Sequence, residues 1–238
     1  MRRPARACLA ALSLLSIPVS VVTGQTAGTI TGKVTLKGIL PKPQVIDMSK
    51  EPECVKLNPK QYMTEDTVTG PGNTLKNVVV FISAGAPARS SAPTTPVSLN
   101  QQNCHYATRV LAFQVDQEVK IINSDPLTHN IHPMPVTNRE WNKVQLKGSS
   151  PISSSFTKPE FLPVKCNLHP WMRAYFAVMG TSYFAVTGED GLFTLPDLPP
   201  GKYTVTAWHE TYGTRNAEIT VAGGQKLTLD FVYSARWQ

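Results

Sequence analysis

CNLHPWM, at residues 166–172, is the stretch from which the rest of this sequence is best interpreted. It places the thiol of Cys166, the imidazole of His169 and the thioether of Met172 at positions i, i+3 and i+6. One short loop therefore carries three donors, and only one more has to come from elsewhere in the fold. Soft sulfur donors combined with imidazole nitrogen favour copper. The stretch predicts a mononuclear copper site.

The fourth ligand is expected from the sequence THNIH at residues 128–132. Two histidines three residues apart point to opposite faces of an extended segment, so only one of them faces the site. His129 is the predicted ligand, because Asn130 beside it can hydrogen-bond across to the Cys166 loop and hold the ligands in place. His132 is kept as a further candidate. Two His and one Cys with a weak axial Met are the donors of a type 1, or blue, copper site, which indicates one-electron transfer.

Other kinds of metal site fit these residues less well. Structural zinc sites usually take more than one Cys and seldom use Met. A dinuclear copper centre would need a second cysteine in the loop, and a catalytic copper an open, His-rich position. His105 is interpreted as an exposed residue, and His209 as part of a polar cluster at the surface or between domains. Pro170 and Trp171 form an apolar group beside His169 that either faces a redox partner or packs against a neighbouring domain.

The first 24 residues have the pattern of a cleaved secretory signal peptide. Arg2, Arg3 and Arg6 form a basic start, an apolar stretch follows from Cys8 to Val22, and small residues precede a cleavage after Gly24. The apolar stretch contains a proline and is too short to span a bilayer. The protein is therefore expected to be periplasmic or secreted, with no transmembrane span after cleavage.

The charge of the remaining chain indicates the kind of partner. Removing the signal takes away three positive charges and no acid, so the formal net charge falls from +7 to +4. A mildly basic surface steers an acidic redox partner toward the protein. The sequence has no Lys and Arg cluster interleaved with aromatic residues, which argues against nucleic-acid binding.

Three cysteines remain after the signal, namely Cys54, Cys104 and Cys166. Cysteines of exported proteins form disulfides when their geometry allows it. If Cys166 binds the metal as a thiolate, Cys54 and Cys104 are left as a disulfide pair. The alternative is that both are free structural cysteines.

Short apolar and β-branched runs between Gly and Pro turns predict an almost all-β chain. Val110 to Val115 and Glu118 to Ile122 are expected to be two strands joined by a tight turn. Phe184 to Thr187 and Leu192 to Leu195 are expected to form a hairpin across a Gly-Glu-Asp-Gly turn. Residues 37–75 have no clear place in this pattern.

Residues from about Val97 to Met179 resemble a cupredoxin. The Cys-x₂-His-Pro-x-Met loop and the His129-Asn130 pair are most similar to those of the amicyanins, which are small blue copper proteins. The resemblance implies a Greek-key β-sandwich. It also implies the same four copper ligands as the donor chemistry: His129, Cys166, His169 and Met172.

The last third resembles the carboxypeptidase regulatory-like, or transthyretin-like, β-sandwich. The resemblance rests on TGEDGLFTLPDLPPGKYTVTAWHE at residues 187–210 and on GTITGKV at residues 28–34. It implies that a cupredoxin is inserted in, or adjoins, a second sandwich. The expected parts are residues 1–24 as signal, 25–95 as the first strands of the regulatory-like sandwich plus a linker, 96–180 as the cupredoxin, and 181–238 as the rest of that sandwich.

Taken together, the sequence predicts an exported blue copper protein that carries single electrons between periplasmic partners, such as a cytochrome c or a dehydrogenase. It predicts an electron carrier and not an enzyme. Two alternatives use the same residues. One is a copper-binding or copper-delivery protein without redox turnover, and the other is a β-sandwich interaction module with a structural metal.

Overall fold

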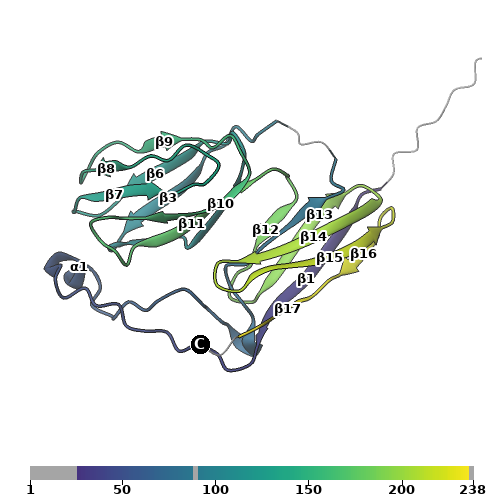
Figure 1. Ribbon diagram of the computed structural model, residues 1–238, viewed down its shortest axis with the longest axis horizontal. Helices are drawn as coiled ribbons and strands as arrows, with labels where there is room; N and C mark the ends of the chain where they lie inside the picture. The colour runs from purple at the N-terminus through teal and green to yellow at the C-terminus, as the bar shows by residue number, and fades with distance from the viewer. Residues whose placement is uncertain (1–25, 88–90, 236–238) are drawn as a thin grey trace, which may run out of the picture.

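The computed structural model describes residues 26–87 and 91–235, and the predicted signal peptide lies outside them. The described strands form two β-sandwiches that lie next to each other (Figure 1). The prediction of an all-β fold is confirmed: within these residues the helical structure is limited to α1 (Pro52–Leu57) and a short 3-10 turn at Pro71–Asn73. No helix in the described part of the chain is long and apolar enough to cross a membrane.

The first sandwich is built from both ends of the described chain. One of its sheets holds β1 (Gly28–Lys37), β13 (Leu192–Leu198), β16 (Lys226–Thr228) and β17 (Phe231–Ser234). The other holds β2 (Val79–Ala84), β12 (Phe184–Val186), β14 (Gly201–His209) and β15 (Gly213–Val221). Position 32 in β1 requires glycine for a steric reason, because a Cβ there would lie 1.8 Å from the carbonyl oxygen of Leu229.

The second sandwich is built from residues between β2 and β12. One sheet has the order β5 (Val110–Gln114), β11 (Arg173–Met179), β10 (Glu160–Lys165), β7 (His129–Pro133) and β8 (Lys143–Gln145). The other has the order β4 (His105–Tyr106), β3 (Val97–Gln102), β6 (Val119–Asn123) and β9 (Ile152–Ser154). The apolar core between these sheets includes Phe113, Ile131 and Phe176, all fully buried.

The two strands predicted on either side of Asp116 are present, whereas the hairpin predicted for residues 184–195 is wrong, because its two strands pair with other partners. β5 pairs with β11 in one sheet, whereas β6 pairs with β3 in the other, so the turn at Asp116 carries the chain from sheet to sheet. In the same way β12 pairs with β2, and β13 with β1. Two strands that face one core from opposite sheets have the same apolar alternation as the two strands of a hairpin. Local sequence therefore cannot distinguish the two arrangements.

Residues 38–75 form an arm that leaves the first sandwich and reaches the end of the second (Figure 1). The arm contains α1, and a short antiparallel bridge between Val45 and Met63 closes it into a loop. Its apolar residues Met48, Cys54 and Leu57 belong to a small cluster that also contains Cys104 and Trp171 of the second sandwich. The stretch that had no place in the sequence pattern thus covers one end of the second sandwich.

A mixed apolar and ionic contact joins the two sandwiches. Phe161 of β10 stacks on Trp208 of β14 with ring centroids 4.3 Å apart. Beside this stack, Arg109 donates two hydrogen bonds to the Glu210 carboxylate, at 2.7 and 2.6 Å. It also pairs with Asp66 of the arm at 2.8 Å. The Arg109 and Glu210 side chains are 8% and 5% exposed, so the pair is removed from water.

We expect Glu210→Gln to lower the free energy of unfolding by about 3 kcal/mol, because it leaves the Arg109 charge buried with only the exposed Asp66 as a partner. Urea denaturation measures this change. Glu189→Gln is the matched control, since it breaks the exposed pair with Lys76, and should cost less than about 1 kcal/mol. Equal small losses in the two variants would show that the buried pair does not stabilise the contact between the sandwiches.

Candidate metal centre

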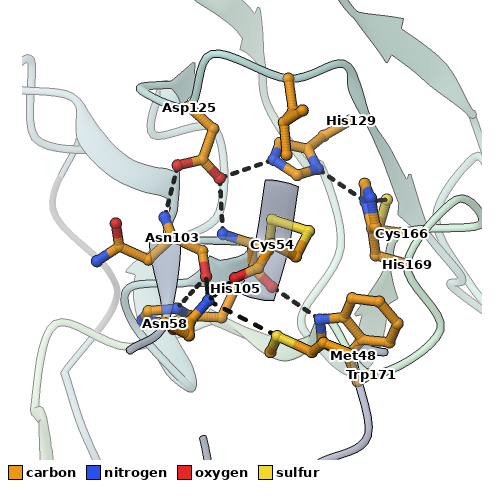
Figure 2. Close-up of a disulfide and its surroundings, with 12 residues drawn as sticks. Met48, Cys54, Asn58, Asn103, His105, Asp125, His129, Cys166, His169 and Trp171 are labelled. Atoms are coloured by element: carbon orange, nitrogen blue, oxygen red, sulfur yellow. Dashed lines mark hydrogen bonds and ion pairs between the residues drawn. A yellow bond between two sulfur atoms is a disulfide. The ribbon is translucent and has the colours of Figure 1, made fainter. Parts of the chain in front are cut away.

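Three potential ligands from separate parts of the second sandwich meet inside it (Figure 2). His129 begins β7, while Cys166 and His169 lie in the loop between β10 and β11. Their donor atoms all lie within 4.8 Å of one another. The two Nδ1 atoms are 2.9 Å apart, and Cys166 Sγ is 3.6 Å from Nδ1 of His169. The three residues are 0%, 1% and 5% exposed, so the donors converge on a point away from solvent.

Hydrogen bonds within the loop bring its donors to one side. The Cys166 N–H donates to the Met172 carbonyl at 3.2 Å, and the Met172 N–H donates to the His169 carbonyl at 2.9 Å. These bonds continue the β10–β11 pairing, which ends at Lys165 and Arg173. Met172 is fully buried and belongs to the same core cluster as Cys166.

Asn130 links the His129 strand to the loop. Its side-chain oxygen accepts hydrogen bonds from the backbone N–H groups of Asn167 at 2.6 Å and Leu168 at 3.3 Å. Its own backbone N–H donates to Cys166 Sγ at 3.5 Å. The predicted contact between Asn130 and the Cys166 loop is therefore present. It holds the loop and the strand at a fixed separation.

Asp125 supports His129, and sequence reasoning missed this role. Its Oδ2 lies 2.8 Å from Nε2 of His129, and the carboxylate accepts the backbone N–H groups of Asn103 and Cys104. This contact occupies Nε2 of His129 and leaves Nδ1 facing the other donors. The available sequence signal was an Asp four residues before a candidate His ligand, at the end of a strand.

The hydrogen bonds of the cluster change the pKa values of its members. Burial lowers the pKa of His129, but its contacts with Asp125 and Cys166 outweigh burial and raise the pKa to about 9. Burial raises the pKa of Cys166, but hydrogen bonds from His129 and His169 overcome it and lower the pKa to about 6. At neutral pH the metal-free site therefore holds a thiolate beside a protonated imidazole.

The remaining histidines lie outside this cluster. His132 is in β7 but contacts Glu140 at 2.6 Å and Asn167 at 3.3 Å. His105 is half-buried and stacks on Tyr62 of the arm, with centroids 4.5 Å apart. His209 is buried in β14 of the other sandwich, where burial and the nearby Arg109 lower its pKa to about 4.

The two apolar residues beside His169, Pro170 and Trp171, have different surroundings. Pro170 is exposed. Trp171 is half-buried, its indole N–H donates to the Cys104 carbonyl at 2.9 Å, and its ring lies 5.4 Å from that of His169. Trp171 also packs against the cluster formed by the arm. The structure therefore shows Trp171 packed against the arm, and a role of Pro170 and Trp171 in facing a partner stays a prediction.

The donor set fits copper better than zinc. Two imidazole nitrogens and one thiolate, with a buried Met in the same loop, form a set with the soft ligands that copper favours. The second close group in the described residues contains Cys104, Asp125 and His129, but the Cys104 sulfur is bonded to Cys54. Only one thiol is therefore offered to a metal among the described residues, unlike in most structural zinc sites.

Comparison with known proteins gives a family match for one part of the chain. Residues 175–234, from β11 to the end of β17, match the carboxypeptidase regulatory-like domain. The match covers the part of the first sandwich that follows the metal loop and begins within β11 of the second sandwich. No curated protein matches the chain.

Among solved structures, the chain is similar to amicyanins. A mutant amicyanin in the Cu(I) form is 21% identical over 42% of this chain and 98% of its own, with a TM-score of 0.33. The amicyanin of Paracoccus versutus is 16% identical over 42% of this chain and 97% of its own, also with a TM-score of 0.33. A copper-containing nitrite reductase from Thermus scotoductus is 21% identical over 42% of this chain and 25% of its own, with a TM-score of 0.34.

Metal binding should release a number of protons that depends on pH, because a metal takes the thiolate and the neutral imidazole. Between pH 6 and pH 9 only His129 of the pair carries a proton to lose, since its pKa is about 9 and that of Cys166 about 6. The pair should therefore release about one proton at about pH 7.5 and about two at about pH 5, and affinity should fall as the pH drops. Titration calorimetry with Zn(II), in buffers of different ionisation enthalpy, measures this number. Equal release at both pH values would contradict the assigned protonation states.

Proposed function

We propose that this protein is an exported type 1 copper protein that carries single electrons between redox partners and is not an enzyme. The observation that carries the proposal is the convergence of His129, Cys166 and His169 at one buried point. Met172, buried in the same loop, is the proposed axial ligand. Bound copper would supply a one-electron couple between Cu(II) and Cu(I).

The support around the donors favours electron transfer over copper delivery. A carrier works best when its ligands keep one arrangement in both oxidation states, since little then has to move. Asp125 holds the His129 ring, and Asn130 holds the loop of Cys166 and His169. Outer contacts of this kind fix ligand orientation. His169 is only 5% exposed, so a partner that removes copper would first have to open the loop.

The disulfide between Cys54 and Cys104 supports export. The two residues are fully buried, and their Cα atoms are 5.6 Å apart. Structural disulfides persist mainly in oxidising compartments such as the periplasm or the cell exterior. We therefore keep the periplasm or the cell exterior as the proposed location, with cleavage of the signal after Gly24.

Addition of Cu(II) should produce an intense blue absorption band and the EPR spectrum of a type 1 centre, because Cys166 supplies the thiolate. Cys166→Ser should lose the band completely, and His129→Gln should lose or strongly alter it. His132→Gln is the matched control, since His132 is in the same strand but contacts Glu140 and Asn167. A colourless protein that prefers Zn(II) would overturn the proposed function.

A groove beside the metal loop is the proposed docking surface for a partner. It has a volume of about 580 Å³, and its lining includes Cys166, Pro170 and Met134. The cationic side chains of Lys165 and Arg173 also line it, on neighbouring strands. The groove therefore combines an apolar wall next to a proposed ligand with positive charge, which fits an acidic redox protein such as a cytochrome c or a dehydrogenase.

Reversing charge at this groove should slow electron transfer with an anionic reagent. We expect Lys165→Glu and Arg173→Glu each to reduce the second-order rate with hexacyanoferrate by roughly threefold to tenfold at low salt, since steering depends on local charge. Stopped-flow absorption of the blue band measures the rate. Lys226→Glu makes the same change of net charge on β16 of the other sandwich and should have a much smaller effect. If all three variants reduced the electron-transfer rate equally, the groove would not be the docking surface.

A further inference from the structure

The main chain of Cys104 contacts the supports of both proposed histidine ligands. Its N–H donates to Asp125 Oδ2 at 2.7 Å, and the same oxygen lies 2.8 Å from Nε2 of His129. Its carbonyl accepts the indole N–H of Trp171 at 2.9 Å, and the Trp171 ring packs against that of His169. One peptide segment therefore reaches both histidines through a single intervening side chain on each side.

The backbone at this point has an unusual conformation. Asn103 and Cys104 both have φ of +55°, in the left-handed region that residues other than glycine seldom adopt. Asparagine adopts this region more readily than most residues with a side chain, but cysteine does not, so the turn persists only when its surroundings hold it. This conformation lets both N–H groups point to the Asp125 carboxylate.

The arm holds this turn in place through a disulfide and a side-chain amide. Cys104 is bonded to Cys54 of α1, and both residues are fully buried. The side-chain amide of Asn58 donates to the Cys54 carbonyl at 2.9 Å and to the Asn103 carbonyl at 2.8 Å. The disulfide and this amide therefore fix the turn on the side of the arm. Asp125 and Trp171 hydrogen-bond to the turn on the side of the proposed metal site.

We propose that Cys104, fixed by its disulfide to Cys54, is a positioning residue for both histidines of the metal site. The inference rests on the proposed function for the identity of the metal, but the positioning itself concerns the protein alone. Without the disulfide, the turn is free to return to ordinary backbone angles. Asp125 then loses a donor and holds the His129 ring less firmly, and Trp171 loses the acceptor that orients it against His169.

The test compares the mature chain with its Cys54→Ala/Cys104→Ala variant by NMR without metal. Two ring protons report the positioning: Nε2–H of His129, bonded to Asp125, and the indole N–H of Trp171. In the variant, the His129 proton should exchange with water about tenfold faster or more, the change expected when a hydrogen bond to a charged group is lost. The Trp171 proton should exchange roughly threefold to tenfold faster, since its acceptor is a neutral carbonyl. Copper affinity, measured by competition with a chelator, should fall roughly tenfold to a hundredfold, as when other outer-shell partners of metal ligands are removed.

Three single variants separate positioning from general loosening of the arm. Tyr62→Phe removes a hydrogen bond to Glu65 within the arm and should leave both ring protons and the affinity unchanged. Trp171→Phe removes the donor to the Cys104 carbonyl, keeps an aromatic ring beside His169, and should leave the His129 proton protected. Asn58→Ala loosens the turn with the disulfide intact and should speed exchange of the His129 proton. If the double variant does not fold, Asn58→Ala replaces it in the test.

The outcomes keep the two proposals distinct. If the folded double variant, or Asn58→Ala in its place, keeps the His129 proton protected as in the parent, Cys104 is not a positioning residue. A blue band in the copper-loaded parent would then leave the proposed function in place. If the parent binds no copper, the proposed function fails, while the exchange measurements without metal still decide whether Cys104 positions the histidines.

Discussion

A buried carboxylate, that of Asp125, is the group on which one end of this protein depends. It is 4% exposed, and a carboxylate removed from water is costly unless hydrogen bonds compensate it. Three donors do so here, from Asn103, Cys104 and His129. Because these donors come from the turn after β3 and from β7, satisfying one charge ties the turn, the disulfide and the metal site together.

The same requirement explains why the arm is part of the metal site's surroundings. Two N–H groups of successive residues can meet one carboxylate only if the turn at Asn103 and Cys104 adopts positive φ. The disulfide to Cys54 and the amide of Asn58 stabilise that turn from outside the sandwich. The arm also packs against Trp171, whose ring lies beside that of His169. The result is a set of donors held in place before a metal arrives, which suits a centre that changes charge without changing shape.

The connection between the sandwiches has a different physical basis. The chain leaves the first sandwich after β2 and returns to it at β12, so both ends of the second sandwich are anchored. The Arg109–Glu210 pair and the Phe161–Trp208 stack then fix how the two bodies meet. A buried ion pair contributes orientation more than net stability, because the cost of desolvation offsets much of the attraction. The groove beside Cys166 borders this contact, because Tyr175 lines the groove and its ring lies 5.5 Å from that of Trp208.

The sequence by itself determined what depends on neighbours along the chain. The spacing of Cys166, His169 and Met172 placed three donors in one loop, and β-branched alternation gave an all-β fold. The three cysteines after the signal left Cys54 and Cys104 either as a pair or as two free residues, and the structure shows the disulfide. The opposite faces of a strand left one of two histidines, and Asn130 beside it favoured His129. Tertiary structure alone decided the rest, because it depends on groups distant in sequence. It placed strands that look paired in different sheets, packed Trp171 against the arm, and brought Asp125 and the Cys104 peptide to the histidines. A local pattern records which face of a strand is apolar, but it does not record what lies opposite that face.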